Sequence, residues 1–437
     1  MYTQPLPYIE NSSDFFEHFV QLPYPVFFDS CKPHEPQGRF DIIAADPIEI
    51  ISDEKDIFNT VREALTALKK NTDTSHAPAL PFTIGAIGYL SYDIGKQLEN
   101  IHSIAKNDIG IPTALVGIYA WSIVIDHQEK KTTLTCCKHD DIQKILRLLN
   151  SKPILKKEFT LTQRFTSNVS AQQYAAAFYA IKHHIEMGNC YQVNLAQRFS
   201  AQFTGSSWYA YQRLREKNPA PYAAFMQLEG GCILSVSPER FLKVHNRIVE
   251  TKPIKGTTPR FTDPQEDAAS ATQLCNSEKD RAENVMIVDL LRNDLSRVCK
   301  PGSVKTPVIC ALESFSNVHH LVSTVTGELS DTKDSLDLLQ HCFPGGSITG
   351  APKIAAMKII ESLEPHSRSL YCGTLFYLDI FDNLDSNIAI RTVICDKENM
   401  HCYAGGGIVY DSDCEKEYAE TWAKVGKIIR ILDNIIE

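Results

Sequence analysis

A hairpin signal near the middle of the chain constrains the fold more than any other segment. Two short apolar runs, 223–228 and 232–236, flank Glu229-Gly230-Gly231, and glycines at such a turn let the backbone reverse tightly. A further strand-like run separates Glu239, at the end of this hairpin, from Lys255, sixteen residues later. We therefore expect antiparallel strands here, with a second hairpin that brings Glu239 and Lys255 side by side.

The first part of the chain is also expected to consist mainly of strands. Residues 1–160 alternate short apolar runs with polar loops, which indicates strands with a few helices, and an amphipathic helix is expected at 54–69. Residues 151–168 are basic and irregular, which is typical of a bridge between two parts of a chain. The 437 residues are compatible with one large domain or with two to three ordinary ones.

Sharper signals follow this bridge. Ser170 and Gln173 form a capping box that opens a helix, and a strand is expected at 190–199. The alternation of side chains in that strand places Gln192 and Asn194 on one face. Two amides on one face of a strand indicate either a wetted surface or the polar lining of a cavity.

Composition favours a small-molecule partner. The formal net charge is −9 and there is no block of basic residues, which argues against binding to nucleic acid or to an anionic membrane. No apolar run reaches about 18 residues and the first residues do not resemble a signal peptide, so we expect a cytosolic protein. The 13 cysteines form no Cys-x-x-Cys pair, so neither disulfides nor zinc are indicated.

Lys255 is a candidate nucleophile. It stands between the rigid pair Pro253-Ile254 and Gly256, so its amine is carried on a backbone with few alternative conformations. A lysine acts as a nucleophile only when part of it is deprotonated, which requires burial or a nearby positive charge. The alternative is a solvated lysine in a turn. Glu239 has a similar alternative, a surface carboxylate that pairs with Arg240.

Two acid pairs stand at the starts of two long helices. Ser277 opens the first helix, in which Asp280 and Glu283 are three residues apart and share one face. Asp280 alone could be the acidic member of a capping box, but Glu283 lies one turn further in.

The last helix of the chain repeats this pattern. We expect Ser412 to cap it, with Glu417 and Glu420 three residues apart on its first turns. If the two helix starts face each other, their four carboxylates would suit magnesium, which takes oxygen ligands. Acidic first turns are also common for a simpler reason, because the helix dipole favours them.

Two glycine-containing segments could hold an anion or simply form turns. The segment 343–353 is not a Walker loop, because Ala351 stands where a lysine should follow Gly350, but it leads through Pro352 into a helix start. The run 404–408 contains three glycines after a strand, where a ligand carboxylate could approach bare backbone.

Four further polar residues interrupt apolar segments. His319 and His320 lie next to each other in an expected strand and should point to opposite faces. Tyr371 and Arg391 place a phenol and a guanidinium on what we expect to be apolar strands. A buried guanidinium needs an anionic partner, so Arg391 is a candidate for holding a ligand carboxylate.

These motifs together resemble the chorismate-utilising enzyme family over residues 170–437. The resemblance is carried, in this order, by Tyr191-Gln-Val-Asn-Leu-Ala-Gln-Arg198, Ser237-Pro-Glu-Arg-Phe241, Pro253-Ile-Lys-Gly-Thr257, Asp280-Arg-Ala-Glu-Asn284, Arg292-Asn-Asp-Leu295, Gly346-Ser-Ile-Thr-Gly-Ala-Pro-Lys353 and Ala404-Gly-Gly-Gly-Ile408. Residues 1–160 are similar to the more variable N-terminal part of aminating members, in Leu22–Ser30 and Arg39–Asp46.

The resemblance implies a fold and a set of ligands. The family fold is of α/β (α+β) type, a large antiparallel β-sandwich covered by helices, in which residues 1–160 and the catalytic region 170–437 pack as one body. The implied substrate is chorismate and the implied cofactor is Mg²⁺. Glu283 and Glu420 are then expected to bind the metal directly, while Asp280 and Glu417 assist through water. Asp280 is shorter than the glutamate of some members, so its metal role is the least certain of the four.

The resemblance also assigns roles to the other candidates. Glu239 corresponds to the general acid that protonates the leaving C4 hydroxyl, and His320 is expected near the reacting ring carbons. The remaining candidates match residues that bind the enolpyruvyl carboxylate or close the site: Tyr371, Arg391, Gly406, Gly407, Ser347, Thr349, Gly350 and Lys353.

Two positions favour amination at C4. Gln192 stands where relatives that add water carry a lysine, and Lys255 stands where anthranilate synthases generally carry alanine. In the resembling enzymes this lysine adds to C2 as the C4 hydroxyl leaves, and ammonia then adds at C4 and expels it. The implied product is 4-amino-4-deoxychorismate, a precursor of para-aminobenzoate and folate.

Partners and alternatives follow from the same resemblance. No glutaminase motif is evident in the sequence, so ammonia is expected from a separate glutamine amidotransferase subunit. Some relatives bind tryptophan near the position of Pro23–Ser30, which makes that segment a candidate pocket. The alternatives are anthranilate synthase component I activity and a catalytically silent paralogue that binds a ligand and regulates a partner.

Overall fold

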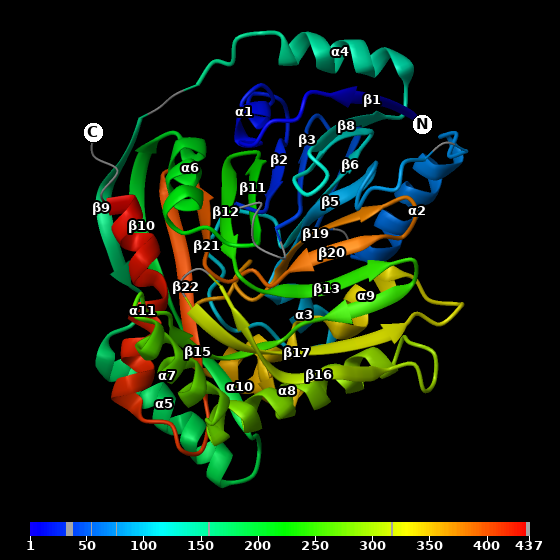
Figure 1. Ribbon diagram of the computed structural model, residues 1–437. Coiled ribbons are helices and arrows are strands. Elements are labelled where there is room, and N and C mark those ends of the chain that lie inside the picture. The colour runs from blue at the N-terminus through cyan, green and yellow to red at the C-terminus, as the bar shows by residue number, and fades with distance from the viewer. Residues whose placement is uncertain (32–37, 54, 76, 156–157, 316–317, 434–437) are drawn as a thin grey trace.

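Two large antiparallel sheets form the centre of the molecule (Figure 1). The computed structural model describes residues 1–31, 38–53, 55–75, 77–155, 158–315 and 318–433. Within these residues the first sheet has 12 strands, in the order β1 (Tyr2–Leu6), β8 (Lys131–Cys136), β7 (Trp121–Asp126), β3 (Phe40–Ala44), β2 (Val26–Asp29), β11 (Tyr222–Leu228), β12 (Gly231–Ser237), β21 (Thr392–Asp396), β22 (Asn399–Ile408), β10 (Gln192–Gly205) and β18 (Gly350–Ala351), with β9 (Phe159–Ser167) paired to β10.

The second sheet contains the strands that carry Lys255 and His320. In the described part of the chain it has 10 strands, in the order β15 (Ile254–Pro259), β17 (Val318–Glu328), β14 (Ile248–Thr251), β13 (Arg240–His245), β20 (Leu384–Asn387), β19 (Thr374–Asp379), β5 (Gly85–Leu90), β6 (Ala114–Tyr119) and β4 (Glu49–Ser52), with β16 (Lys305–Ser314) paired to β17.

Both sheets contain strands from the first and the second part of the chain. In the first sheet β2 pairs with β11, so that Phe27 lies opposite Phe225, and Figure 1 shows the blue strand beside the green one. In the second sheet β5 pairs with β19, which places Ile87 opposite Tyr377. A large cluster of buried side chains draws on strands of both sheets. Strands β5 and β6 are buried at every residue, which explains why they read as continuous apolar runs.

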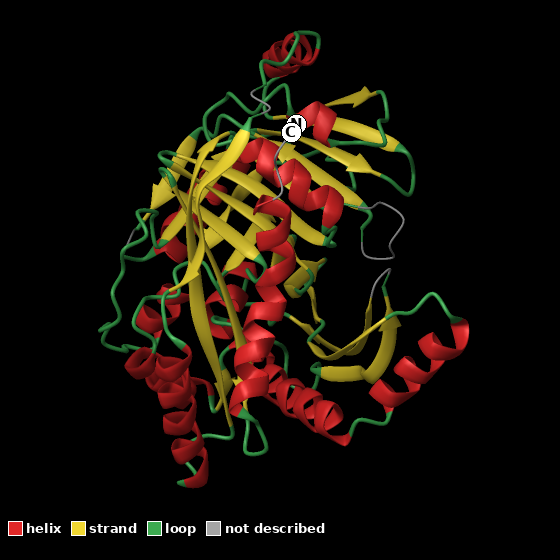
Figure 2. Ribbon diagram, turned by 90° about the vertical axis from the view of Figure 1, so that its left-hand side faces the viewer, coloured by secondary structure: helices red, strands yellow, loops and turns green. Residues whose placement is uncertain are grey.

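Helices cover the strands from outside, as Figures 1 and 2 show. Helix α8 packs on β15, β16 and β17, α11 packs on β22 and β9, and α5 and α10 pack on β10. The helices are α1 (Ser13–Phe16), α2 (Ile57–Lys70), α3 (Tyr92–Leu98), α4 (His139–Leu149), α5 (Ala171–Glu186), α6 (Ser207–Lys217), α7 (Pro264–Cys275), α8 (Glu278–Ser296), α9 (Ser335–Cys342), α10 (Lys353–Leu363) and α11 (Cys414–Asp433), with a short 3-10 turn η1 (Gly346–Ile348).

The locally encoded elements are as the sequence predicts. Strands β11 and β12 form the expected hairpin and remain in register as far as Leu228 and Gly231. Helix α5 begins with the expected capping box, in which Ser170 and Gln173 satisfy each other's backbone amides. Helix α2 occupies the expected amphipathic segment, and Ser277 caps α8 through the amide of Asp280.

Two predictions about segments are wrong. Residues 158–168 are not an irregular bridge, because β9 runs through them and pairs with β10; only Phe159 and Phe165 in that strand are buried, so its apolar signal is weak. The glycines at 405–407 lie within β22 rather than after it. They look like a loop in the sequence, but they pair with β10 along their whole length.

Three further residues lie in elements other than those predicted. Tyr371 and Arg391 are not in strands: Tyr371 lies in a buried turn before β19, and Arg391 precedes β21 with a φ of 50°. A buried turn has the same apolar composition as a strand, which explains the error. Helix α11 is capped by Asp413, whose carboxylate accepts the amide of Lys416 at 3.0 Å, and not by Ser412.

Two general features bear on the predicted environment. Within the described ranges we find no helix whose length and apolarity would allow it to cross a membrane. The 13 cysteines are free thiols, and nine of them are buried.

Candidate active site

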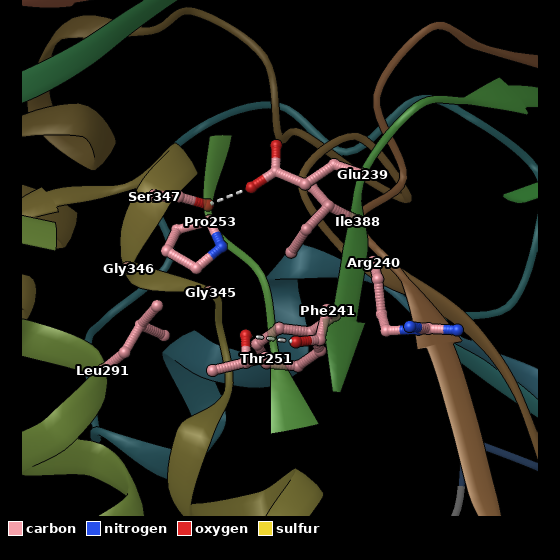
Figure 3. Close-up of a pocket in the computed structure, with 10 residues that line it drawn as sticks. All are labelled: Glu239, Arg240, Phe241, Thr251, Pro253, Leu291, Gly345, Gly346, Ser347 and Ile388. Atoms are coloured by element: carbon pink, nitrogen blue, oxygen red, sulfur yellow. Dashed lines mark hydrogen bonds between the residues drawn. The ribbon is translucent and has the colours of Figure 1, made fainter. Parts of the chain in front are cut away.

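Glu239 and Lys255 meet at one residue of the 3-10 turn η1. The hydroxyl of Ser347 donates a hydrogen bond to Glu239 Oε1 at 2.9 Å (Figure 3). The Lys255 Nζ donates to the carbonyl oxygen of Ser347 at 3.1 Å. Glu239 stands just before β13 and Lys255 lies in β15, with the hairpin of β13 and β14 between them. The hairpin therefore brings the acid and the amine together, as the sequence predicts.

The environment of Glu239 favours its protonated form. Its side chain is buried, and burial raises the pKa of the carboxyl to about 7, although the Ser347 hydroxyl, Lys255 and Arg391 oppose the rise. Figure 3 shows the carboxylate directed towards Ser347 while Arg240 extends away from it. Arg240 instead pairs with Asp385 and Glu250, so the alternative of a surface Glu239–Arg240 pair is wrong.

A small void lies beside Glu239 and Ser347. Its volume is about 10 Å³, which is room for one water molecule. The void is lined by glycines of the η1 loop and by apolar side chains that include Pro253, Leu291 and Ile388 (Figure 3). A carboxyl group with a raised pKa that faces such a restricted space is typical of a general acid.

The surroundings of Lys255 lower the pKa of its amine. The residue lies in β15, paired with Leu321, so the alternative of a solvated turn is wrong. Burial lowers the pKa of its amine, and Lys424 adds to this effect, whereas Glu283 and Glu239 oppose it. A buried amine with a lowered pKa has the property that a nucleophilic lysine requires.

The four predicted metal-binding acids lie on the first turns of α8 and α11, and they influence one another. Burial raises the pKa of Glu283, and Asp280 and Glu420 raise it further. Burial also raises the pKa of Glu417, to which Glu420 again adds. The two helix starts therefore face each other closely enough for their negative charges to interact.

These acids are not arranged as a finished metal cage. Among the described residues, no group of three or more histidines, cysteines or acids is positioned to hold a metal ion. Each acid instead contacts a neighbour on its own helix or cap: Asp280 accepts the Ser277 hydroxyl, Glu283 lies 3.9 Å from Lys279, Glu417 accepts the Ser412 hydroxyl at 2.8 Å and Glu420 pairs with Lys424 at 2.7 Å.

Arg391 is a guanidinium with spare hydrogen-bonding capacity. Burial lowers its pKa, and Glu239 is the acid that partly compensates. Within the described ranges Arg391 makes no ion pair or side-chain hydrogen bond, so an anionic ligand would satisfy it. The ring of Tyr371, a second predicted ligand residue, is buried and stacks on Tyr403 with 5.3 Å between centroids.

The glycines of β22 make room for polar side chains. A Cβ atom at Gly406 would lie 2.7 Å from Glu417 Oε2, and one at Gly407 would lie 2.5 Å from Gln192 Nε2. Larger residues would therefore displace an acid or an amide of the site. The Oε1 of Gln192 is buried and has no hydrogen-bond partner among the described residues, which favours a cavity lining over a wetted surface.

The two histidines of β17 differ, as predicted, in the faces they occupy. His320 is buried against the Thr257 hydroxyl, 2.8 Å from its Nδ1, and burial lowers its pKa to about 4, so it is neutral near pH 7. His319 contacts Asp267 at 3.1 Å and Ser314 at 2.7 Å on the other side, which is a satisfied structural arrangement.

The loop from Ser347 to Lys353 is only partly directed at the site. Thr349 is buried and its hydroxyl donates to the carbonyl of Gly345 at 2.8 Å, while Gly350 adopts a φ of 139° beside the backbone of Gln192. The Lys353 amine pairs with Asp294 at 2.7 Å and with the Cys342 carbonyl at 3.0 Å. The structure therefore does not bring Lys353 together with Lys255 and Glu239.

Lys424 is a charged neighbour of the site that the sequence analysis missed. Its Nζ donates to the carbonyl of Gly405 at 2.9 Å and pairs with Glu420, and its charge acts on Lys255. The available signal is its spacing: Lys424 lies one turn after Glu420, and therefore on the same face of α11.

Comparisons with known proteins agree with the predicted family. The model of the chorismate binding enzyme family matches residues 24–430. Aminodeoxychorismate synthase component 1 of Escherichia coli (strain K12) is 43% identical over 435 residues, which cover 96% of each chain. Anthranilate synthase component 1 of Streptomyces coelicolor is 36% identical, over 83% of this chain and 76% of the relative.

A solved structure confirms the fold class. The crystal structure of anthranilate synthase component I from Streptococcus pneumoniae TIGR4 has a TM-score of 0.80 and 32% identity to this chain, covering 90% of this chain and 92% of the other. The expected antiparallel sandwich with covering helices is therefore the fold of the molecule.

Proposed function

This chain belongs to the chorismate binding enzyme family, and we propose that it converts chorismate and ammonia into 4-amino-4-deoxychorismate, the precursor of para-aminobenzoate for folate. The observation that carries the proposal is the joint contact of Lys255 and Glu239 with Ser347. The proposal is supported by the curated relatives, because the E. coli relative at 43% identity is an aminodeoxychorismate synthase component 1.

In the proposed reaction, Lys255 and Glu239 act in the first step. The neutral Lys255 amine adds to C2 of chorismate, the double bond shifts, and the C4 hydroxyl leaves as water with a proton from Glu239. Ammonia then adds at C4, the double bonds shift back and the C2–lysine bond breaks, which returns the neutral amine. The new ammonium group at C4 passes a proton to the Glu239 carboxylate, which restores the acid. The raised pKa of Glu239 and the lowered pKa of Lys255 support these roles, because each group must start in its neutral form.

The substrate carboxylates require cationic and amide partners. We assign the enolpyruvyl carboxylate to Arg391 and Tyr371, with the backbone at Gly406 and Gly407 completing the contact. The uncommitted guanidinium of Arg391 supports this assignment, and so do the glycines of β22, whose backbone carries no side chain that would keep a carboxylate away. Neutral His320 is proposed to lie beside the ring, where an imidazolium would be unfavourable because of burial.

The acid pairs of α8 and α11 suit magnesium. Glu283 and Glu420 would hold the ion directly, and Asp280 and Glu417 would hold its water. The fit rests on the surroundings of Glu283, whose pKa is raised mainly by burial and further by Asp280 and Glu420, because a bound divalent cation would favour the charged carboxylates. When bound, the ion would hold the ring carboxylate and assist loss of the C4 hydroxyl.

The remaining proposals concern partners and location. Ammonia would come from a separate glutamine amidotransferase subunit, and the name of the E. coli relative as a component 1 supports a partner component. Residues 1–160 and 170–437 would work as one body, which the shared sheets support. A cytosolic location fits the lack of a membrane-crossing helix in the described part.

Tryptophan remains a proposed ligand at Pro23–Ser30. The Ser30 hydroxyl is buried and has no hydrogen-bond partner among the described residues, which supports a small polar ligand there. Calorimetry with L-tryptophan tests this proposal, and a lack of binding at millimolar concentration would exclude it.

Product analysis tests the main proposal. The purified chain is incubated with chorismate, MgCl₂ and ammonium at pH 8, and the products are identified by mass spectrometry. We expect 4-amino-4-deoxychorismate. Anthranilate as the main product would indicate the alternative synthase activity, and chorismate binding without turnover would indicate a regulatory paralogue.

A further inference from the structure

A buried ion pair lies behind the residues that contact Lys255 and Glu239. Arg368 is 1% exposed, and its guanidinium donates to both carboxylate oxygens of Glu364, at 2.9 Å from Nε and 2.7 Å from Nη2. This bidentate geometry satisfies the charge of the buried guanidinium. Neither residue is among the candidates that the sequence indicates.

The remaining hydrogen bonds of this pair reach two separate segments. Arg368 Nη2 also donates to the Asn194 carbonyl in β10 at 2.7 Å, and Nη1 donates to the Ile348 carbonyl in η1 at 3.3 Å. Glu364 Oε1 accepts the amide of Ala196 at 2.9 Å. The ion pair therefore joins strand β10 to the turn η1.

Asn194 strengthens the same connection. Its Nδ2 donates to the Ile348 carbonyl at 2.7 Å, and its backbone amide donates to the Thr349 carbonyl at 3.0 Å. Ile348 is thus held by Arg368 and by Asn194, and it is bonded directly to Ser347. Ser347 in turn contacts both Lys255 and Glu239, so its position depends on the hold on Ile348.

The guanidinium also supports a predicted ligand residue. It lies over the ring of Tyr92 at 4.8 Å and near the ring of Tyr371 at 5.6 Å, so it packs between two aromatic side chains. A lysine could keep the charge, but it could not serve Glu364, two carbonyls and two rings at once.

We propose that Arg368, oriented by Glu364, is a positioning residue that fixes Ser347 against Lys255 and Glu239. The inference rests on the proposed function for its catalytic consequence, but the contacts themselves do not depend on it. The charged and titratable groups that face Glu239 are Lys255, Arg391 and the Cys372 thiol. Arg368 acts on the carboxyl only through the Ser347 segment.

Arg368→Lys tests this role, with Arg215→Lys as a matched control. Arg215 also forms a bidentate pair with a buried acid, Asp29, but it lies far along the chain in α6 and does not contact the site. For Arg368→Lys we expect kcat for the amino product to fall about 10–100-fold, because small displacements of catalytic groups have effects of this size. For Arg215→Lys we expect a lower thermal midpoint with kcat nearly unchanged.

The pH dependence separates positioning from simple destabilisation. A looser Ser347 hydroxyl stabilises the Glu239 carboxylate less, so the pKa of Glu239 rises and the basic limb of kcat moves up by roughly half a unit or more. A limb that stays in place in Arg368→Lys, with kcat close to the wild-type value, would overturn the inference. If Arg368→Lys does not fold, Glu364→Gln, which leaves Arg368 in place, is measured instead.

A second readout does not require turnover. The stability of each protein is compared with that of its Glu239→Gln version between about pH 5 and pH 8.5, since the gap between them follows the ionisation of Glu239. We expect the pH at which this stability difference changes to be higher in Arg368→Lys than in the wild type. A gap that coincides with that of the wild type would refute the inference, whereas failure of the wild type to aminate chorismate would refute only the proposed function.

Discussion

Replacement of Glu239 by glutamine should stabilise the folded protein, and the gain should grow with pH. The carboxyl is buried, and its pKa rises from 4.5 to about 7, mainly because burial disfavours the charged form. The folded protein therefore binds more protons than the unfolded chain between these two values. The stability of the wild type falls as pH rises through this window and stays reduced above it.

The size of the effect follows from the two pKa values. Each pH unit between them is worth about 1.4 kcal/mol, so the buried carboxylate costs about 3 kcal/mol above pH 7. A 437-residue chain has an unfolding entropy of about 0.9 kcal/mol per degree, on average values per residue. The midpoint of Glu239→Gln should therefore exceed that of the wild type by about 3 °C at pH 8.5, and the gap should shrink towards pH 4.5.

The assay is thermal unfolding followed across pH, with Glu361→Gln as the control. Burial alone would raise the pKa of Glu361, but the amide of Ala105 and the amine of Lys96 hold it below its usual value. Such a carboxylate contributes stability that is lost only as pH falls through its folded pKa. Glu361→Gln should therefore be less stable than the wild type by an amount that stays constant between about pH 5 and pH 8.5.

Activity provides the second half of the test. Loss of a general acid usually lowers kcat about 10²–10⁴-fold, and the basic limb near pH 7 should disappear in Glu239→Gln because glutamine does not titrate. Glu361→Gln should retain both the rate and the limb. Midpoints of Glu239→Gln and wild type that run parallel over the whole pH range would refute the argument that Glu239 is buried with a raised pKa.

Three further predictions test the remaining assignments. Lys255→Ala should abolish the amino product, while the affinity for chorismate, measured by calorimetry, stays within about threefold of the wild-type value. Lys252→Ala is the control, and full turnover by Lys255→Ala would exclude Lys255 as the nucleophile. Activity should be lost with EDTA and recovered with Mg²⁺, and Glu283→Gln and Glu420→Gln should each raise the Mg²⁺ concentration needed at least tenfold; unchanged titrations would exclude these ligands. Gln192→Lys should divert part of the chorismate to its isomer with the hydroxyl at C2, because a lysine there could activate water as the C4 hydroxyl leaves. Chromatography that separates the two isomers and finds no such species would contradict the branch assignment.

The sequence predicts the parts of the fold that depend on neighbouring residues. The hairpin of β11 and β12 and the capping box of α5 are encoded within a few positions, and both are present. Pairing of β2 with β11 joins residues nearly two hundred positions apart, and no local pattern specifies such a partner. The resemblance to a family implied only that the two parts of the chain pack as one body. The glycines of β22 look like a loop in the sequence. They lie within a strand because the side chains of Glu417 and Gln192 pack where a Cβ atom would stand.

The same distinction applies to the site. The closeness of Glu239 and Lys255 follows from one hairpin, so it could be predicted from spacing. The interaction between Glu283 and Glu420 joins two helices far apart in the chain, and spacing gave only the two separate pairs. Arg368 and Glu364 lie four residues apart, a spacing that usually indicates an exposed pair. Their burial is a property of the packed molecule and has no local signal.

The contacts of Ser347 help to explain why burial raises the pKa of Glu239 only to about 7. Burial alone would raise the pKa of Glu239 further, and the acid would then hold its proton more firmly. The Ser347 hydroxyl and the Lys255 charge oppose burial, and the resulting value of about 7 lets the carboxyl both donate and regain a proton near neutral pH. Lys255 is balanced in the same way, because Glu283 and Glu239 oppose its burial. The acid and the amine therefore need each other nearby, and one turn of backbone that contacts both keeps their separation fixed.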